Sequence, residues 1–263
     1  ARAEREGDKR RASMTALIDV LEAREGVICA VGAGGKKSVL YQLAREHPGR
    51  VALTATAHTT EFPADLAVQQ IVDVDARLQD RVGAADPSRS VAYACPSSKP
   101  GRHAGVTPAT IRAIHDAGGF AATYVKADGA RMRWIKAPTP DEPILVPGAD
   151  IVIPVVSARA IGEPLGERVA HRVDHVAAVT GIVPGETLTP EAVGRLLASE
   201  QGSLQRTGGA RVAPVINMVD NENQEEMARA AASAAIAMTS RFDRVVLCCL
   251  RRPEGPVVAV VTG

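Results

Sequence analysis

The segment with the clearest chemical potential is a glycine-rich turn followed by two lysines. It consists of Gly32, Ala33, Gly34, Gly35, Lys36, Lys37 and Ser38, and it follows the apolar residues 27–31. Glycines let backbone N–H groups turn toward an anion, and the N-terminus of a following helix adds partial positive charge. Lys36 then stands where a lysine reaches terminal phosphates. The segment predicts a loop that binds the phosphates of ATP or GTP, with a plain strand-to-helix turn as the alternative.

The spacing of this loop matches the short G-x-x-G-K form. Ala30 stands where the full G-x-x-x-x-G-K-[ST] pattern has its first glycine. Lys37 occupies the position of the hydroxyl residue that normally holds Mg²⁺, and Ser38 comes one residue later. A lysine at 37 also excludes the third glycine of a dinucleotide fingerprint. The pattern therefore favours a nucleotide loop and leaves Mg²⁺ binding by Ser38 open.

A carboxylate follows another apolar run and is the second candidate for chemistry. Asp128 comes directly after residues 120–127 and precedes Gly129. The carboxyl ends of parallel strands meet at a ligand crevice, where a carboxylate can organise a metal ion or water beside phosphates. We predict that Lys36 and Asp128 are catalytic and that Asp128 and Ser38 are the Mg²⁺ ligands. A simple Asp-Gly turn is the alternative for Asp128.

Five further residues are predicted to contact a substrate or its phosphate. Thr56 and His58 end the second apolar run in a cluster of hydroxyl residues, and Arg131 follows the Asp-Gly pair. His171 and Arg172 place two potential anion contacts near the start of a predicted helix. Solvated loop or surface positions are the alternative for all five.

Asn217 and Asp220 end the apolar run 212–216 and are predicted to read the base. A carboxylate accepts hydrogen bonds from the ring N–H and the amino group of guanine, which favours GTP slightly over ATP. Met218 stands where guanine-reading loops commonly have a lysine. An Asx turn that caps the next helix is the alternative.

The alternation of apolar and helical segments predicts an α/β fold. We expect a mostly parallel sheet with helices on both faces, a three-layer α/β/α arrangement like that of P-loop NTPases. Strands are expected at 27–31, 51–56, 70–74, 91–95, 121–127, 151–155, 212–216, 244–250 and 257–261. Helices are expected from Met14 through Leu21, at 37–46, 107–117, 168–180 and 189–199, and at 222–239 with Asn221 as its cap. The Asp128 strand should lie near the strand that feeds the loop.

Composition narrows the class of protein. The chain has 263 residues, is 46% hydrophobic and carries a formal charge of +1, so it can bury a large core and gives no reason to expect a nucleic-acid partner. Its four cysteines lack CxxC spacing, and no apolar run approaches a membrane span or signal peptide, so we expect a cytoplasmic protein without a membrane partner. Residues 1–13 are expected to be a disordered tail or an extension. Residues 14–263 are expected to form one α/β domain, and the proline-rich stretch 137–147 is the boundary if it has two lobes.

With these residues identified, the chain resembles the YqeC family, accessory proteins of selenium-dependent molybdenum hydroxylases. The matching pieces are Val31 to Lys36, the threonine-rich strand end through His58, Ala127 to Arg131, Lys136-Ala137-Pro138 with Glu142-Pro143, Gly162 to Arg172, and Asn217 to Asp220. The resemblance implies a role in maturing a molybdenum hydroxylase and in handling its selenium or sulfur cofactor, with that enzyme or its cofactor-assembly proteins as partners. Two positions depart from the family pattern: Lys37 replaces a hydroxyl residue, and Asp141 replaces a histidine.

Three functions are consistent with these features. The first is a maturation factor that hydrolyses a nucleoside triphosphate. The second is an ATP-dependent ligase or kinase, because the short loop is similar to that of the Mur ligases. The third is a nucleotide-sensing partner protein without turnover, which Lys37 suggests.

Overall fold

The computed structural model describes residues 16–252 and 255–263, so the tail predicted at 1–13 lies outside the described residues. The strands are β1 (Gly26–Gly32), β2 (Val51–Ala55), β3 (Thr59–Thr60), β4 (Val68–Val72), β5 (Ser90–Pro96), β6 (Arg102–Ala104), β7 (Ala122–Lys126), β8 (Ile135–Lys136), β9 (Ile151–Ser157), β10 (Ala170–His171), β11 (Arg211–Val212), β12 (Val215–Asn217), β13 (Arg244–Cys248) and β14 (Val257–Thr262). The helices are α2 (Leu17–Val20), α3 (Lys36–Glu46), α4 (Asp75–Gly83), α5 (Pro108–Gly118), α6 (Val173–Thr180), α7 (Pro190–Ala198) and α8 (Glu222–Met238), with a 3-10 turn η1 (Ala158–Ala160).

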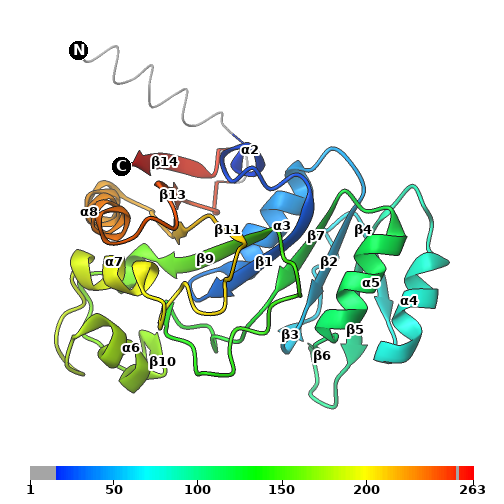
Figure 1. The fold of residues 1–263 in the computed structure, drawn as a ribbon, viewed down its shortest axis with the longest axis horizontal. Coiled ribbons are helices and arrows are strands. Elements are labelled where there is room, and N and C mark those ends of the chain that lie inside the picture. Colours follow the sequence, from blue (N-terminus) through cyan, green and yellow to red (C-terminus); the bar gives the residue numbers. More distant parts are fainter. Residues whose placement is uncertain (1–15, 253–254) are drawn as a thin grey trace, which may run out of the picture.

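A twelve-stranded mixed sheet forms the centre of the molecule (Figure 1). Its order is β14-β13-β12-β9-β1-β7-β2-β5-β6-β3, with β11 beside β9 and β4 beside β5. The strands from β13 to β5, together with β4 and β11, pair in parallel, and the antiparallel pairs involve β14, β3 and β6 at the two edges. The predicted α/β fold with a mostly parallel sheet is therefore confirmed.

Helices cover both faces of this sheet. α2 and α3 pack on one face through Leu17, Val39 and Leu43, against inward residues of the central strands such as Ile28 and Ile153. On the other face, α4 and α5 cover the β7-to-β4 half, and α7 and α8 cover the half from β9 to β14. Strands buried on both faces carry nearly continuous apolar runs, which is why β1 and β9 read as unbroken hydrophobic segments.

The strand order brings the predicted loop and the predicted carboxylate together. β1 lies between β7 and β9, and Ala30 pairs in register with Lys126. The glycine-rich loop therefore leaves the sheet beside the segment that contains Asp128. The expectation that these two strands lie near each other is confirmed, because they are direct neighbours.

Several element boundaries differ from the sequence-based expectation. The strand predicted at 212–216 is split into β11 and β12, because Pro214 has no N–H with which to continue a ladder. The helix predicted at 168–180 begins only at Val173, because Ala170 and His171 pair with β8. α4 follows β4 and was not predicted, and α2 has only four residues.

Side chains cap three of the described α-helices. Thr107, Thr189 and Asn221 each accept a hydrogen bond from the backbone N–H three residues later, so the predicted cap of α8 is confirmed. α2, α3, α4 and α6 have no side-chain cap, and the N-cap residue of α3 is Gly35, which has no side chain. No helix of the described chain is long and apolar enough to cross a membrane.

The contact between α7 and α8 gives a test of the packing. A Cβ added at Gly194, in the middle of α7, would lie 2.8 Å from both Ala231 O and Ala234 Cβ, whereas nothing lies within 4 Å of one added at Gly83, the last residue of α4. Gly194→Ala should destabilise the protein by about 1 to 3 kcal/mol, and Gly83→Ala should stabilise it by up to about 1 kcal/mol. Urea unfolding of both variants measures this. Shifts of the same sign would contradict the close α7–α8 packing.

Candidate functional site

The glycine-rich loop is pressed against the ends of β9 and β12. Three of its glycines have positive φ angles, and an added Cβ at each would lie under 3.0 Å from a neighbouring atom. The glycines are Gly32, Gly34 and Gly35, and the atoms they would meet are Val155 O, Ser157 N and Asn217 Nδ2. Glycine is therefore required here both by backbone conformation and by space.

The amides of the loop itself bind to the protein. Gly32 N donates to Asp128 Oδ2 at 2.9 Å, Ala33 N to Val155 O at 2.8 Å and Gly34 N to Arg133 O at 3.1 Å. The first N–H groups of a helix have no partner within the helix, and Gly35 has no side chain to cap those of α3. The structure thus places the donors suited to an anion at the start of α3, at Lys36 to Ser38, rather than in residues 32–34.

A chain of charged side chains lies beside this helix start. Lys36 Nζ is 2.8 Å from Asp128 Oδ1, and Lys136 Nζ is 2.9 Å from Asp128 Oδ2 and 2.6 Å from Glu142 Oε2. Arg172 closes the chain with a two-pronged contact to Glu142 at 2.5 and 3.1 Å. We call these five residues the charge network. It holds three cations and two carboxylates, which leaves an excess of positive charge.

Most of this network is removed from water. Lys36, Asp128 and Lys136 are 5%, 3% and 2% exposed. Lys36 also donates to Gly32 O, and Lys136 donates to Gly129 O at 2.7 Å. The Oδ1 atom of Asp128 is fully buried, and its contact with Lys36 is an ion pair without hydrogen-bond alignment. Buried charges persist only when paired, so each member of the network depends on its neighbours.

The pKa shifts follow from this burial and pairing. Burial lowers the pKa of Lys36, and the charge of Asp128 opposes that shift. Burial alone would raise the pKa of Asp128, but Lys36 and Lys136 outweigh it and the pKa lies below its ordinary value. Burial would likewise raise the pKa of Glu142. Hydrogen bonds from Arg172 and Lys136 outweigh this effect and lower the pKa to about 2. Both carboxylates are therefore ionised at neutral pH, as their four contacts with Lys36, Lys136 and Arg172 require.

The predicted substrate residues are placed around the network with different roles. Arg172 belongs to it, and His171 lies beside Lys136 in the β8–β10 pair. Burial and the charge of Arg172 lower the pKa of His171 to about 4, so its ring is neutral at pH 7. Arg131 is exposed in the turn after Gly129. Thr56 is buried, and its hydroxyl donates to Ile144 O at 2.7 Å.

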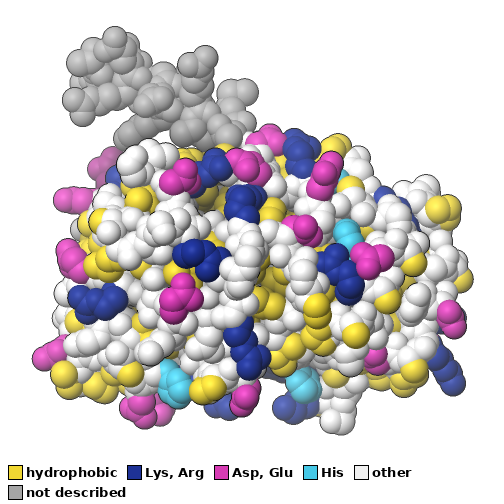
Figure 2. Space-filling model, in the orientation of Figure 1, with side chains coloured by type: hydrophobic (Ala, Val, Ile, Leu, Met, Phe, Trp, Pro, Cys, Tyr) yellow, Lys and Arg dark blue, Asp and Glu magenta, His cyan; other side chains and the backbone are white. Residues whose placement is uncertain are grey.

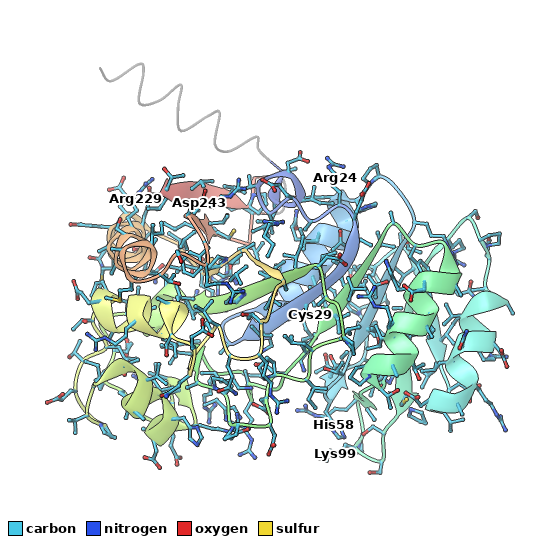
Figure 3. All side chains as sticks on the ribbon, in the orientation of Figure 1. Arg24, Cys29, His58, Lys99, Arg229 and Asp243 are labelled. Carbon is cyan, nitrogen blue, oxygen red and sulfur yellow. The ribbon has the colours of Figure 1, made fainter. Side chains whose placement is uncertain are left out.

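The side of α3 that faces β2 and β3 holds the remaining predicted contacts. Ser38 is exposed on the first turn of α3, while the Lys37 side chain reaches Thr60 Oγ1. The His58 side chain is exposed and its carbonyl accepts a hydrogen bond from Lys126 at 2.8 Å. Figure 3 shows His58 at the lower edge of the molecule beside Lys99, opposite Asp243 and Arg229. Lys36 and Lys37 thus diverge toward different neighbours.

The two predicted base-reading residues have different surroundings. Asn217 is buried and its Nδ2 donates to Gly34 O at 2.9 Å, while its Oδ1 atom has no hydrogen-bond partner among the described residues. Asp220 binds the Arg159 guanidinium at 2.5 and 3.1 Å and accepts from Cys249 Sγ at 3.3 Å. Asn217 is therefore in direct contact with the loop, and Asp220 is held by Arg159.

Sequence reasoning gave no site role to Lys126 or Arg159 and named Lys136 and Glu142 only among the pieces of the family resemblance, whereas the structure brings all four to the site. Lys126 ends the apolar strand β7 and is 9% exposed. Burial, and to a lesser extent the nearby positive charge of Lys36, lowers the pKa of Lys126 to about 7. A lysine inside a buried apolar run was a usable signal. Glu142 lies in the proline-rich stretch, where only the fold reveals its two cationic partners.

A separate cavity lies at the opposite edge of the sheet. It has a volume of about 280 Å³ and is bordered by Arg211, Arg241 and Arg244 near the amino ends of β11 and β13. Asp243, which also lines it, is labelled in Figure 3 far from His58. None of the predicted site residues lines this cavity.

The Glu142 contacts predict a pH-dependent contribution to stability. The folded pKa of about 2 lies below the ordinary value of 4.5, so the contribution is complete above pH 4.5 and disappears as the pH falls to about 2. Glu142→Gln should cost on the order of 2 to 3 kcal/mol at pH 7 and almost nothing near pH 2. Urea unfolding of parent and variant across this range measures the difference.

The matched control is Glu163→Gln, because the Glu163–Arg168 pair is largely exposed. Its cost should stay below about 1 kcal/mol. A Glu142→Gln cost that does not change with pH would contradict the ion-pair assignment.

Comparison with known proteins shows which family this chain resembles. The family model described as YqeC protein matches residues 28–174, over half of the chain, including the loop, Asp128, Glu142 and Arg172. The protein named Uncharacterized protein YqeC from Escherichia coli (strain K12) is 28% identical over 197 residues, which cover 72% of this chain and 74% of that protein. The chain belongs to the YqeC protein family.

Proposed function

We propose that this protein binds a nucleoside triphosphate at the N-terminus of α3 and hydrolyses it during the maturation of a molybdenum-containing hydroxylase. The observation that carries the proposal is the uncapped start of α3, placed at the carboxyl edge of β1 next to a buried network with excess positive charge. Helix N-termini bind anions through free amides and the helix dipole. Ligand sites of open α/β sheets also lie at this edge.

Phosphoryl transfer depends mainly on positioning and on stabilising negative charge, which this site supplies with lysines and amides. Lys36 is the residue best placed to exchange its Asp128 contact for a phosphate oxygen, since it stands on the first turn of α3. Release of Lys36 from Asp128 would leave a carboxylate oxygen to orient water or Mg²⁺. Asp128 and Ser38 are the residues that would hold Mg²⁺, which would neutralise phosphate charge.

The maturation role rests on family membership and on the family resemblance rather than on side-chain geometry. The family model covers the loop, the charge network and His171, so the proposed site lies inside the shared segment. Its partner would be the hydroxylase or the proteins that assemble its selenium or sulfur cofactor. Purified hydroxylase from cells that lack this protein should then contain less complete cofactor, and full cofactor content would contradict the role.

Nucleotide binding without turnover is a second candidate function, and the state of Asp128 favours it. Both carboxylate oxygens face lysine ammonium groups, so Mg²⁺ must displace a cation to reach them. Lys37 stands between Lys36 and the Ser38 hydroxyl in the chain. Measuring phosphate release from saturating ATP or GTP, with and without Mg²⁺, separates the two functions.

The divergence of Lys36 and Lys37 predicts unequal losses on substitution. Lys36→Ala should weaken triphosphate binding by one to two orders of magnitude, because a charge-assisted contact contributes roughly 1.5 to 3 kcal/mol. Lys37→Ala should have a much smaller effect on the nucleotide, since its side chain reaches Thr60. Titration calorimetry with a non-hydrolysable triphosphate gives both affinities. A larger loss for Lys37→Ala would show that the chosen register is wrong.

Base reading by Asp220 is tested by competition among GTP, ATP and XTP. If Asp220 accepts from guanine, the parent prefers GTP and Asp220→Asn loses that preference, since an unpaired buried acceptor costs about 1 to 3 kcal/mol. Arg159→Gln is the control, because Arg159 is the ion-pair partner of Asp220. Equal affinities in the parent remove the base-reading role, and loss of preference in both variants assigns it to the Arg159–Asp220 pair as a unit.

A further inference from the structure

Lys126 is a buried cation without a carboxylate partner. It is 9% exposed, and its Nζ donates to the His58 carbonyl at 2.8 Å. No ion pair with Lys126 occurs within residues 16–252 and 255–263, whereas Lys36, Lys136 and Arg172 are all paired with Asp128 or Glu142. A backbone carbonyl offsets only part of the cost of removing an ammonium group from water. An anion bound beside Lys126 would supply the missing counter-charge.

Two other cations lie along the same side of α3. Lys37 reaches Thr60 Oγ1, and Thr60 pairs in register with Arg102 across β3 and β6. Burial and, after it, the positive charge of Arg102 lower the pKa of Lys37, which shows that the two cations are close. Neither residue forms an ion pair with a carboxylate in the described chain. Figure 2 shows Lys or Arg side chains gathered beside a histidine at this lower edge, under β3 and β6 of Figure 1.

The hydrogen bonds of Lys126 and Lys37 point away from the charge network, although Lys36, Asp128 and Lys136 lie near enough for their charges to shift the pKa of Lys126. Lys126 pairs in register with Ala55 of β2, and its side chain reaches the 56–60 segment that continues from β2. Lys36 instead reaches Gly32 O and Asp128, on the β1 and β8 side. Lys36 therefore has a carboxylate partner, whereas Lys37 and Lys126 bind only a hydroxyl and a carbonyl of the 56–60 segment.

We infer that Lys126, Lys37 and Arg102 form a second anion subsite, which takes an oxyanion group, phosphate or carboxylate, of the acceptor molecule. Its role as an acceptor site rests on the proposed function, but anion binding by the three cations does not. Three unpaired cations around the 56–60 segment match a group with two or more negative oxygens. The Thr60 hydroxyl and the His58 ring stand in the same segment and can add hydrogen bonds. The oxyanion could also be the terminal phosphate of the nucleotide, and the test separates these sources.

The test uses inorganic phosphate as the probe, titrated into the full chain by calorimetry in the presence of saturating ADP and in its absence. Lys126→Met and Arg102→Gln should each weaken phosphate binding roughly tenfold or more, as expected for loss of one charge-assisted contact. Lys99→Gln is the matched control, because Lys99 is an exposed cation that Figure 3 shows near His58. This substitution removes one positive charge, as the test variants do, but at a residue outside the proposed subsite. It should bind phosphate like the parent. Arg102 is exposed, so its variant is expected to fold even if Lys126→Met does not.

A second readout separates the subsite from a structural role. Lys126→Met and Arg102→Gln should lose the rise in melting temperature that phosphate gives the parent, whatever their own melting temperatures without ligand. If both variants weaken the binding of free phosphate and of a triphosphate analogue alike but leave ADP affinity unchanged, the oxyanion is the nucleotide's terminal phosphate.

Failure of the subsite and failure of the nucleotide proposal give different results. If the parent protein binds phosphate through Lys126 and Arg102 but binds no nucleotide, the subsite is supported and the proposed nucleotide function is contradicted. Phosphate affinities in Lys126→Met and Arg102→Gln equal to those of the parent and of Lys99→Gln would overturn the inference.

Discussion

The Asp128 carboxylate is the interaction on which the site depends. It accepts the Gly32 amide at the start of the loop, the Lys36 ammonium from α3 and the Lys136 ammonium from β8. A carboxylate this deeply buried would be costly without such partners, and the two lysines would be equally costly without it. One side chain thus fixes the loop, the first turn of α3 and the segment after β7 relative to one another. The rest of the charge network extends from that point.

The glycine-rich loop acts as a structural support for a helix start more than as a ring of free donors. Its amides at 32–34 are used by Asp128, Val155 and Arg133, and its glycines allow contact with β9 and β12. This close packing holds α3 at the carboxyl edge of the sheet without a capping side chain. α2, α4 and α6 also lack a capping side chain, so the feature that sets the start of α3 apart is its Gly35 N-cap next to the charge network. Local rules are most often broken in this way at sites that bind a ligand.

The cations around α3 differ in what neutralises them. On one side, each lysine or arginine shares a carboxylate with a neighbour, so pairing stabilises the fold. On the other side, Lys126 has only a carbonyl as partner, and Lys37 has only a hydroxyl. Ion pairs stabilise the arrangement of the side chains that form them. A buried cation without a counter-charge is instead stabilised when an anion binds beside it. This division separates cations that are neutralised within the protein from Lys126 and Lys37, which have no carboxylate partner among the described residues.

The sequence by itself determined the elements and their edge of the sheet. The alternation of apolar and helical segments predicted a mostly parallel sheet, the glycines predicted a turn at the end of β1, and Asn221 predicted the cap of α8, because each depends on residues close in the chain. The expectation that the Asp128 strand lies near the loop strand also came from the sequence, since parallel strands place their carboxyl ends together. The sequence could not predict which charges pair. Glu142 meets Arg172 across 30 residues, Arg159 meets Asp220 across 61, and Asn217 meets Gly34 across 183. Only the tertiary structure decided these contacts and left Lys126 without a carboxylate, because side chains pair according to distance in space, which strand order sets and local sequence does not record.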